Sequence, residues 1–234
     1  MIVIFKRELA SYFRTPVGYV FTGVFLLLSG ICFAVSNLAQ YSCDMLTTLN
    51  FMSYIWMLLC PVLVMRLIAG ERAKKTDSLM YSSPCSMTAI VLAKYFAAAV
   101  VMLISVAITF IYPLILALWG TLYLPETCVG YLGFILQGAA FIAFDLLLSS
   151  FTRSQVTCTV ICMGANLLLW LADLLTGTAG FLGTVLSFFN LYNRLTPFTQ
   201  GILNYASVLF YVIFTAVSLF ISVRVLDARR WSNT

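Results

Sequence analysis

The side chains that could do chemistry are few in this chain, and the densest group lies between two apolar runs, in the segment Arg66–Lys94. Only 9% of the residues are Asp, Glu, Lys or Arg, and this segment holds five of the 13 basic ones. Charged groups are costly to bury in an apolar surrounding, so charge gathered in one short segment is charge presented to water. We therefore expect Arg66–Lys94 to face an aqueous compartment and to bind a partner there.

Catalytic and metal-binding sets are missing from the sequence. The chain has no His, no GxxxxGK[ST] phosphate-binding loop, and no HExxH or GxSxG motif. Its seven Cys include no CxxC pair, and Cys158 and Cys162, one helical turn apart, lack the His that would complete a zinc set. We predict structural thiols, no metal or cofactor in this chain, and no enzymatic activity. Cys43 and Cys128 are expected in outer loops, either as free thiols or as a disulfide.

The composition is that of an integral membrane protein. Hydrophobic residues make up 62% of the 234 residues and the mean hydropathy is +1.03, whereas a soluble domain is about 45–50% apolar and roughly 25% charged. The net charge of +5 follows the membrane topology given below, so nucleic acid is not an expected partner and membrane lipid is. The length suits a single transmembrane domain over residues 1–234.

Apolar segments long enough to cross the roughly 30 Å hydrocarbon core as helices recur along the chain. Helices satisfy their own backbone in lipid, and the alternating pattern of a membrane barrel is absent. The predicted fold is therefore an all-α integral membrane protein with six transmembrane helices. The predicted spans are Val17–Ala39, Thr48–Ile68, Ala89–Trp119, Val129–Phe151, Gln155–Leu175 and Leu203–Val223.

The residues before the first span predict a helix that lies in the membrane interface. In residues 1–16, apolar side chains recur at helical spacing and basic ones fall mainly on the other side. Thr15 and Pro16 then end the helix. The alternative is a frayed basic tail, and the spacing favours the amphipathic helix. The residues expected to orient it are Phe5, Lys6, Arg7, Glu8, Tyr12 and Arg14.

The segment between the fifth and sixth spans, residues 176–202, is too apolar for a free loop and is interrupted by glycines. We predict a re-entrant or interface-parallel helical hairpin on the outer side. A seventh span is rejected because it would place Arg224, Arg229 and Arg230 outside.

Basic residues predict the orientation. With the N-terminus in the cytoplasm, twelve of the 13 lie at or near the cytoplasmic face, and Arg194 is the exception. We therefore expect a multi-pass protein of the plasma (inner) membrane with both termini cytoplasmic. The twelve are Lys6, Arg7, Arg14, Arg66, Arg72, Lys74, Lys75, Lys94, Arg153, Arg224, Arg229 and Arg230.

Polar residues inside the spans have two interpretations. Asp145 either lines a substrate pathway and couples helix movements, or it is paired locally with Arg153 or reached by cytoplasmic water. The local explanation is the simpler one, because long Arg side chains reach along a helix. Asn166 and Gln137 are expected to make interhelical hydrogen bonds.

The charged loop resembles the segment between the second and third spans of ABC-2 type permeases, above all the branch of the gliding-motility permease. Its sequence reads ERAKKTDSLMYSSPCSMTAIVLAKY, and Lys75 and Ser78 depart from the family pattern, where Gly and Glu are usual. Segments near both ends and around the fourth and fifth spans resemble the same branch in the expected order, with Asp145 where Gly is usual. The residues that match in the loop are Glu71, Arg72, Thr76, Leu79, Ser83, Pro84, Lys94 and Tyr95.

The resemblance implies a permease subunit of an ATP-driven transporter, with an exporter as the expected direction. It implies an ABC ATPase as partner, which would bind ATP and Mg, and a second copy or a related permease to complete a dimer. The coupling loop, residues 69–89, would dock on the ATPase through mixed charges and an apolar anchor. A non-transporting membrane scaffold or assembly subunit is the alternative. The loop residues implied in coupling are Glu71, Arg72, Lys74, Lys75, Thr76, Asp77, Leu79, Tyr81 and Pro84.

Overall fold

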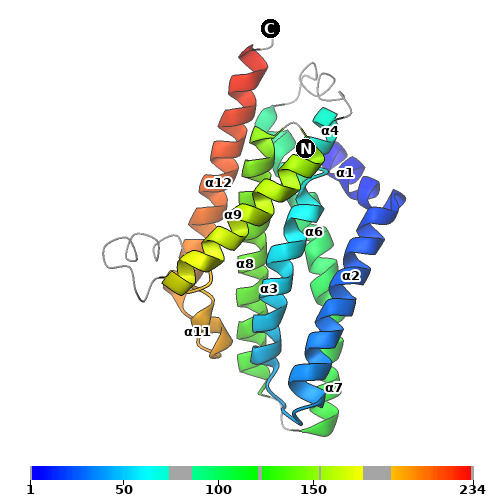
Figure 1. Ribbon diagram of the computed structural model, residues 1–234, viewed down its shortest axis with the longest axis vertical. Coiled ribbons are helices and arrows are strands. Elements are labelled where there is room, and N and C mark those ends of the chain that lie inside the picture. Colours follow the sequence, from blue (N-terminus) through cyan, green and yellow to red (C-terminus); the bar gives the residue numbers. More distant parts are fainter. Residues whose placement is uncertain (1, 74–85, 121–122, 153, 176–190, 233–234) are drawn as a thin grey trace.

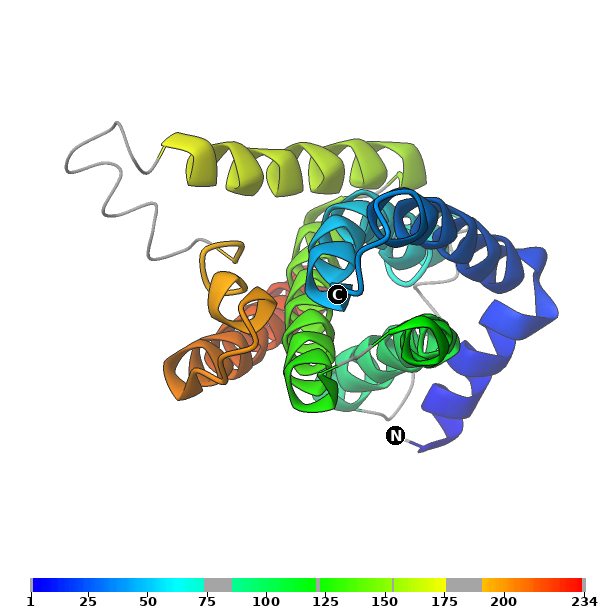
Figure 2. The same ribbon diagram turned by 90° about the horizontal axis from the view of Figure 1, so that it is seen from below.

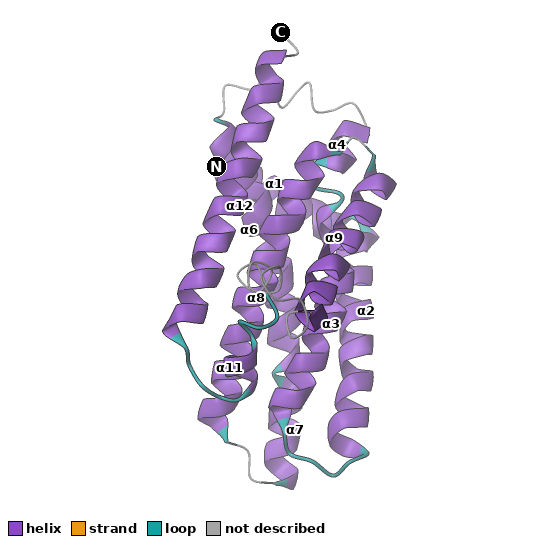
Figure 3. Cartoon of the chain, turned by 60° about the vertical axis from the view of Figure 1, so that its left-hand side comes forward, coloured by secondary structure: helices purple, strands orange, loops and turns teal. Residues whose placement is uncertain are grey.

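The computed structural model describes residues 2–73, 86–120, 123–152, 154–175 and 191–232. Within these ranges the chain is helical and contains no strand (Figure 3), as predicted. The helices are, in chain order, α1 (Ile2–Arg14), α2 (Pro16–Phe33), the π-helical η1 (Ala34–Leu38), α3 (Met45–Val64), α4 (Ala69–Ala73), α6 (Met87–Thr109), α7 (Ile111–Trp119), α8 (Leu124–Phe151), α9 (Gln155–Leu175), α11 (Thr196–Thr199) and α12 (Tyr205–Ser232).

Five helical stretches of the described chain are long and apolar enough to cross a membrane. Each overlaps one of the predicted spans, so hydropathy located them correctly. They are Pro16–Leu38, Met45–Val64, Met87–Leu118, Leu124–Phe151 and Tyr205–Ala228.

The sixth predicted span, α9, has the expected bounds but is not confirmed as a crossing. The apolar part of α9 that the structure describes, Gln155–Leu171, is shorter than the other five stretches. The helix also runs obliquely across the bundle in Figure 1, in front of α3 and α8. The structure therefore supports five membrane-crossing helices.

The long helices run roughly side by side, with α8 packed most extensively against α12 and α3. Figure 1 shows α1, α4 and both chain termini at one end of the bundle, called the terminal end below. The connection from α2 to α3, the end of α7 and the start of α8 lie at the opposite end. Seen along the bundle in Figure 2, α9 forms one edge, and α11 and α12 occupy a corner away from α1.

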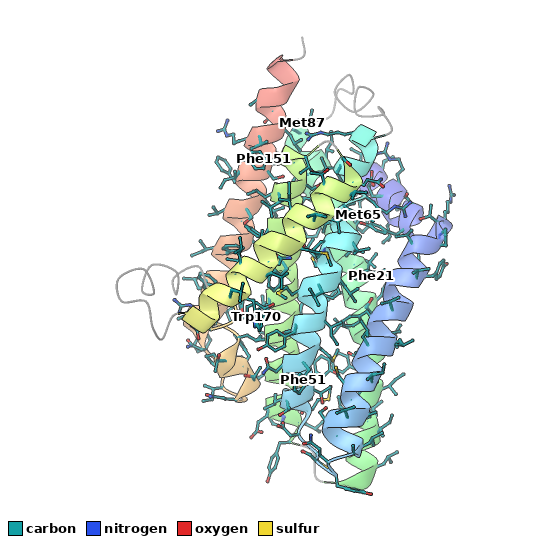
Figure 4. All side chains as sticks on the ribbon, viewed as in Figure 1. Phe21, Phe51, Met65, Met87, Phe151 and Trp170 are labelled. Carbon is teal, nitrogen blue, oxygen red and sulfur yellow. The ribbon has the colours of Figure 1, made fainter. Side chains whose placement is uncertain are left out.

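The outside of the bundle is apolar, as lipid contact requires. Phe51 and Phe151, labelled in Figure 4, are 48% and 51% exposed. A water-soluble protein would cover such large side chains or gather them in one interaction patch. Here they belong to helices that qualify as membrane spans.

The core is centred on Trp56 of α3, which is 1% exposed. Its ring meets Phe21 and Phe25 of α2 edge-on, with centroids 5.7 and 5.5 Å apart, and lies 6.3 Å from Phe134 of α8. Edge-to-face pairs add about 0.5–1.5 kcal/mol each beyond area burial. A Cβ at Gly138 would lie 3.2 Å from Trp56 Nε1, so the small residue lets α8 approach α3 closely.

Two prolines inside helices each leave a carbonyl without its helical partner, and another helix supplies the missing donor. Pro61 cannot donate to Met57 O, because proline lacks the N–H that would bond the residue four positions earlier. The side chain of Asn166 in α9 donates to Met57 O at 3.3 Å. Pro113 in α7 frees Thr109 O in the same way, and Tyr131 of α8 donates its hydroxyl to it at 3.0 Å. These bonds link each proline-containing helix to a neighbouring helix.

Polar side chains close the turn between α2 and α3 at the opposite end. Asn37, 1% exposed, donates to the carbonyls of Ser42 and Asp44, both at 3.1 Å. Ser36 donates to Asn37 Oδ1 and also bonds Thr48, each at 2.8 Å. Asp44 then caps α3 by accepting from the backbone N–H of Leu46 at 3.0 Å.

The predicted outer hairpin over residues 176–202 is not confirmed. Residues 176–190 lie outside the described part of the chain, and residues 191–202 form turns around the single-turn helix α11. This described part packs inward: a Cβ at Gly133 of α8 would lie 2.5 Å from the fully buried Phe198. Tyr211 of α12 also donates to Leu191 O at 2.6 Å, so the segment is bound to both α8 and α12.

Candidate functional site

Polar side chains at the terminal end connect helices that are far apart in the sequence. We call this group, formed by Glu8, Tyr12, Arg66, Arg72 and Lys94, the polar junction. Its members come from α1, from the segment between α3 and α4, from α4 and from α6. Figure 1 shows α1 and α4 at the same end of the bundle. The junction therefore lies at the end of the bundle where the predicted coupling loop begins.

Lys94 of α6 lies at the centre of the junction and is 1% exposed. Its Nζ donates to Leu67 O at 2.6 Å and to Glu8 Oε1 at 3.4 Å. The same Glu8 oxygen accepts from Arg7 Nη2 at 2.8 Å. Buried charges need both a counter-ion and hydrogen bonds to offset their lost hydration, and Lys94 has both. The ion pair links α1 to α6, and the bond to Leu67 O links α6 to the turn that follows α3.

Two more bonds join α1 and the residue after it to the end of α3 and the turn that follows it. The Tyr12 hydroxyl donates to Leu63 O at 2.9 Å, and Arg66 Nη1 donates to Thr15 Oγ1 at 3.0 Å. Burial, with a smaller contribution from the Glu8 carboxylate, raises the pKa of the Tyr12 phenol well above its usual range. Tyr12 therefore stays a neutral donor at every physiological pH.

The predicted amphipathic helix corresponds to α1, and its polar residues divide into two groups. Lys6, Arg7 and Arg14 are exposed and Phe5 is half-buried, as the helical spacing suggests. Glu8 differs, because it is 8% exposed and paired with Lys94. Glu8 stands among basic neighbours, and nothing in the sequence predicted that its carboxylate would be buried.

Arg72 of α4 binds the end of α8. Its Nη1 donates to Ser150 O at 2.7 Å and to Thr152 O at 2.9 Å. The last carbonyls of a helix lack intrahelical partners and carry partial negative charge, so a guanidinium satisfies both needs. The backbone N–H of Ala69 adds a bond to Ser149 Oγ at 3.3 Å. The start of the predicted loop is thus attached to α8.

Most of the predicted coupling residues fall outside the part of the chain that the structure describes. Glu71 lies in α4, but its side chain is not described, so Arg72 is the member of the set whose contacts are known. The loop ends where Ser86 caps α6, accepting from Ala89 N at 3.4 Å. The predicted residues outside the described ranges are Lys74, Lys75, Thr76, Asp77, Leu79, Tyr81 and Pro84.

A second polar group lies deeper, where α3, α8 and α9 meet. Asn166 Nδ2 donates to the two carboxylate oxygens of Asp145 at 3.1 and 3.4 Å, as well as to Met57 O. Asp145 and Asn166 are both 0% exposed. The partner of Asp145 is thus on a neighbouring helix, while Arg153, the partner considered from the sequence, lies outside the described residues.

Gln137 does not join this group. It is 1% exposed, and its Nε2 has no hydrogen-bond partner among the described residues. Of the three polar residues singled out within the spans, the structure therefore brings Asp145 and Asn166 together and leaves Gln137 apart.

The cysteines that the structure describes form no metal-binding arrangement. Cys158 and Cys162 are buried with their sulfurs 3.9 Å apart, and Cys43 and Cys128 are free thiols. In the described ranges no three His, Cys, Asp or Glu side chains gather as ligands for a metal ion. The polar junction therefore connects helices mechanically.

The sequence did not single out Lys94 or Arg66 as site residues, although both were recognised as basic residues near the cytoplasmic face. Lys94 carried a signal, since it stands near the start of an apolar run where a cation needs a partner. Its partner Glu8 is 86 residues away in the chain, and no local pattern connects the two. Arg66 also looked like an ordinary basic residue at the end of a span.

Comparison with known proteins identifies the family of this chain. No curated protein matches the chain. A family model described as ABC-2 family transporter protein matches residues 25–227, which run from within α2 to within α12 and include Arg66, Arg72 and Lys94 of the junction. The match covers well over half of the chain, so this membrane protein, with its five apolar crossing helices, belongs to the ABC-2 family of transporter proteins.

Proposed function

We propose that the chain is the permease subunit of an ATP-driven exporter in the plasma membrane. A separate ABC ATPase subunit binds ATP and Mg, and its movement is transmitted to this chain through the loop between α4 and α6. Two permease chains, identical or related, form the pathway between them. Family membership supports the transport role, and the ordered resemblance to the gliding-motility branch supports the assignment within the family.

The observation that carries the proposal is the connection of both loop ends to the bundle. Arg72, just before the loop, bonds the end of α8. Lys94, two turns into the helix that follows the loop, bonds α1 and the turn after α3. A displacement of the loop would therefore act on four helices together. A subunit whose sequence has no nucleotide-binding loop of its own needs such a connection to receive movement from a separate ATPase.

The charge distribution supports cytoplasmic termini. The described basic side chains at the terminal end include Lys6, Arg7, Arg14 and Arg72. Loops rich in Lys and Arg stay on the cytoplasmic side. An ATPase bound to the loop would share that compartment with its ATP.

Photo-crosslinking tests the proposal directly. We would place p-benzoylphenylalanine at Tyr81, within the loop, and separately at Tyr41, which is 93% exposed near the opposite end. Membranes of the native host would be irradiated, and the crosslinked partner would be identified and tested for ATP binding. We expect Tyr81 to capture an ATP-binding subunit and Tyr41 to capture none. Capture of no ATP-binding protein at Tyr81, or the same one at both positions, would contradict the proposal.

A further inference from the structure

Asp145 of α8 is a carboxyl group enclosed between helices, with no cation beside it. It lies six residues, about 9 Å, before the end of a helix that qualifies as a membrane span, and it is 0% exposed. Among the described residues, no Lys or Arg side chain lies within ion-pair distance of it. A buried carboxylate without a counter-ion is so costly that the group takes up a proton instead.

Thiols are the titratable groups that face Asp145. Cys60 approaches from α3, and Cys158 and Cys162 approach from α9. Cys162 Sγ also donates to the backbone O of Asp145 at 3.7 Å. In the described part of the chain, α6 and α12, which also pack against α8, bring no charged group within ion-pair distance of Asp145. A thiol is a weak hydrogen-bond donor, so these neighbours do not replace a cation.

The amide of Asn166 provides independent support, because one of its two ends has no partner. Its Nδ2 donates to the two carboxyl oxygens of Asp145 and to Met57 O. Oδ1 of the same amide is buried and has no hydrogen-bond donor among the described residues. An ionised carboxyl group only accepts hydrogen bonds, whereas a protonated one also has an O–H to donate. One proton on Asp145 would therefore remove the uncompensated charge and supply the missing donor.

We propose that Asp145 is a proton-binding site, occupied while α9 is packed against α8, and that its proton bonds Oδ1 of Asn166. The acid and the amide then form a neutral pair in which each group donates to the other. The terminal torsion of an Asn side chain is broad, which lets Oδ1 turn toward one carboxyl oxygen while Nδ2 keeps the other. Such a fully satisfied pair is well suited to a place with little water.

The pair is the strongest polar attachment of α9 to the bundle among the described residues. Two other contacts lie on either side of Asn166 along the helix. Thr159 Oγ1 donates to Met65 Sδ at 2.9 Å, and the ring of Trp170 lies edge-on to that of Tyr54 with centroids 6.3 Å apart. Met65 and Trp170 are labelled in Figure 4. A thioether is a weak acceptor, so the proton on Asp145 contributes much of what holds α9 in place.

Movement of α9 would release the proton. The start of α9 lies against α4, because a Cβ at Gly70 would be 2.7 Å from Gln155 Nε2. A displacement of α4 can therefore pull α9 from α8 and admit water to Asp145. The acid then gives its proton to a water molecule and remains as a carboxylate, which opposes the return of α9 until a proton is bound again. This site does not depend on which substrate or ATPase the chain binds.

Infrared spectroscopy of the full-length chain in lipid nanodiscs tests for the proton. A protonated carboxyl group has a carbonyl band that a carboxylate lacks. We expect the wild-type chain to show this band at neutral pH and Asp145→Asn to lose it, whereas Asp44→Asn, at an exposed residue, keeps it. A wild-type spectrum without the band, or an undiminished band in Asp145→Asn, overturns the proposal. Should Asp145→Asn fail to insert, wild-type chain made with isotope-labelled aspartate carboxyls decides, because a band that does not shift cannot come from Asp145.

Backbone hydrogen exchange tests whether the proton holds α9. Asn has the shape of a protonated Asp, both donates and accepts, and does not ionise. After correction for the intrinsic effect of pH, the amides of α9 should exchange equally fast in wild type and Asp145→Asn at neutral pH. At alkaline pH they should exchange at least about fivefold faster in wild type. Asp145→Leu, which cannot bond Asn166, should show the faster exchange at both pH values.

Two exchange results would overturn the role of the proton. One is equal exchange in wild type and Asp145→Asn at alkaline pH. The other is exchange in Asp145→Asn at neutral pH that is as fast as in Asp145→Leu, since a carboxylate that only accepts bonds would not be replaced by an amide.

Discussion

Glu8 and Lys94 form a buried ion pair, with Oε1 and Nζ 3.4 Å apart, between helices at the start and in the middle of the chain. The pair makes α1 a bound part of the bundle, since separating α1 from α6 would take the Glu8 carboxylate away from the buried ammonium of Lys94. A helix that looks like a surface anchor in the sequence is thereby attached to α6, the helix that follows the predicted coupling loop.

Removing one member of this pair should be strongly destabilising. We expect Lys94→Met to lower the free energy of unfolding by about 1.5–3 kcal/mol, because Glu8 keeps the exposed Arg7 as a partner but loses its bond to the buried ammonium. Thermal unfolding of the detergent-purified chain measures the change. Lys6→Met is the matched control, since Lys6 is exposed on α1, and it should change stability by less than about 0.5 kcal/mol.

The double variant Glu8→Gln/Lys94→Met separates loss of the pair from loss of packing. We expect it to be more stable than Lys94→Met alone, because no charge remains unpaired. Equal stability of the single and double variants would show that the ion pair does not hold α1 in place.

Asn166 serves two acceptors, and its removal should reveal both. Asn166→Leu should cost about 1–3 kcal/mol for each acceptor left without a donor, measured by the same unfolding assay. Gln137→Leu is the control: it also replaces a buried amide, but its Nε2 has no described partner, so the cost should be near zero. A similar loss in both variants would mean that burial of an amide, and not its bonds, matters.

A proline substitution tests the link between Asn166 and the Met57 carbonyl that Pro61 leaves without a backbone donor. Pro61→Ala restores the N–H that can donate to Met57 O. In that background Asn166→Leu should cost about 1 kcal/mol less than in the wild-type chain. Strictly additive effects would show that Met57 O does not depend on Asn166.

Loss of Arg72 should loosen the end of α8 and weaken coupling. Arg72→Ala removes two donors from the carbonyls of Ser150 and Thr152, so backbone amides of the last turn of α8 should exchange about tenfold faster. Arg14→Ala, at an exposed basic residue, is the control. In the complex with its ATPase, Arg72→Ala and Glu71→Ala should uncouple ATP hydrolysis from transport while insertion stays normal. Unchanged exchange and coupling would place the contact elsewhere.

Alkaline pH should test the environment of Tyr12. A raised pKa means that the folded state holds the phenolic proton more tightly than the unfolded chain. The corresponding stability is complete below about pH 10, the usual tyrosine pKa, and is lost as pH rises above it. Tyr12→Phe removes this contribution, so its stability should fall less steeply than that of the wild-type chain between pH 9 and about 11. Parallel curves would contradict the assignment.

Helix positions could be predicted from the sequence because lipid imposes a local rule. A run of about 20 apolar residues favours a crossing helix whatever its neighbours are, and five of the six predicted spans overlap helical stretches long and apolar enough to cross. No such local rule predicts which side chains on different helices will pair. Asp145 and Asn166 were both recognisable as polar residues inside spans, yet their contact depends on how α8 and α9 rotate about their axes. Glu8 and Lys94 are further apart still, and only the packed bundle brings them together.

The proline in α3 also has a consequence for biosynthesis. Met57 and Pro61 are synthesised long before Asn166, which is 109 residues after Met57. Until α9 is made, the side chain that donates to the Met57 carbonyl in the folded structure is missing. We therefore expect α3 to stay where water or another polar group can reach this carbonyl, and to enter lipid fully only after α9 has been synthesised.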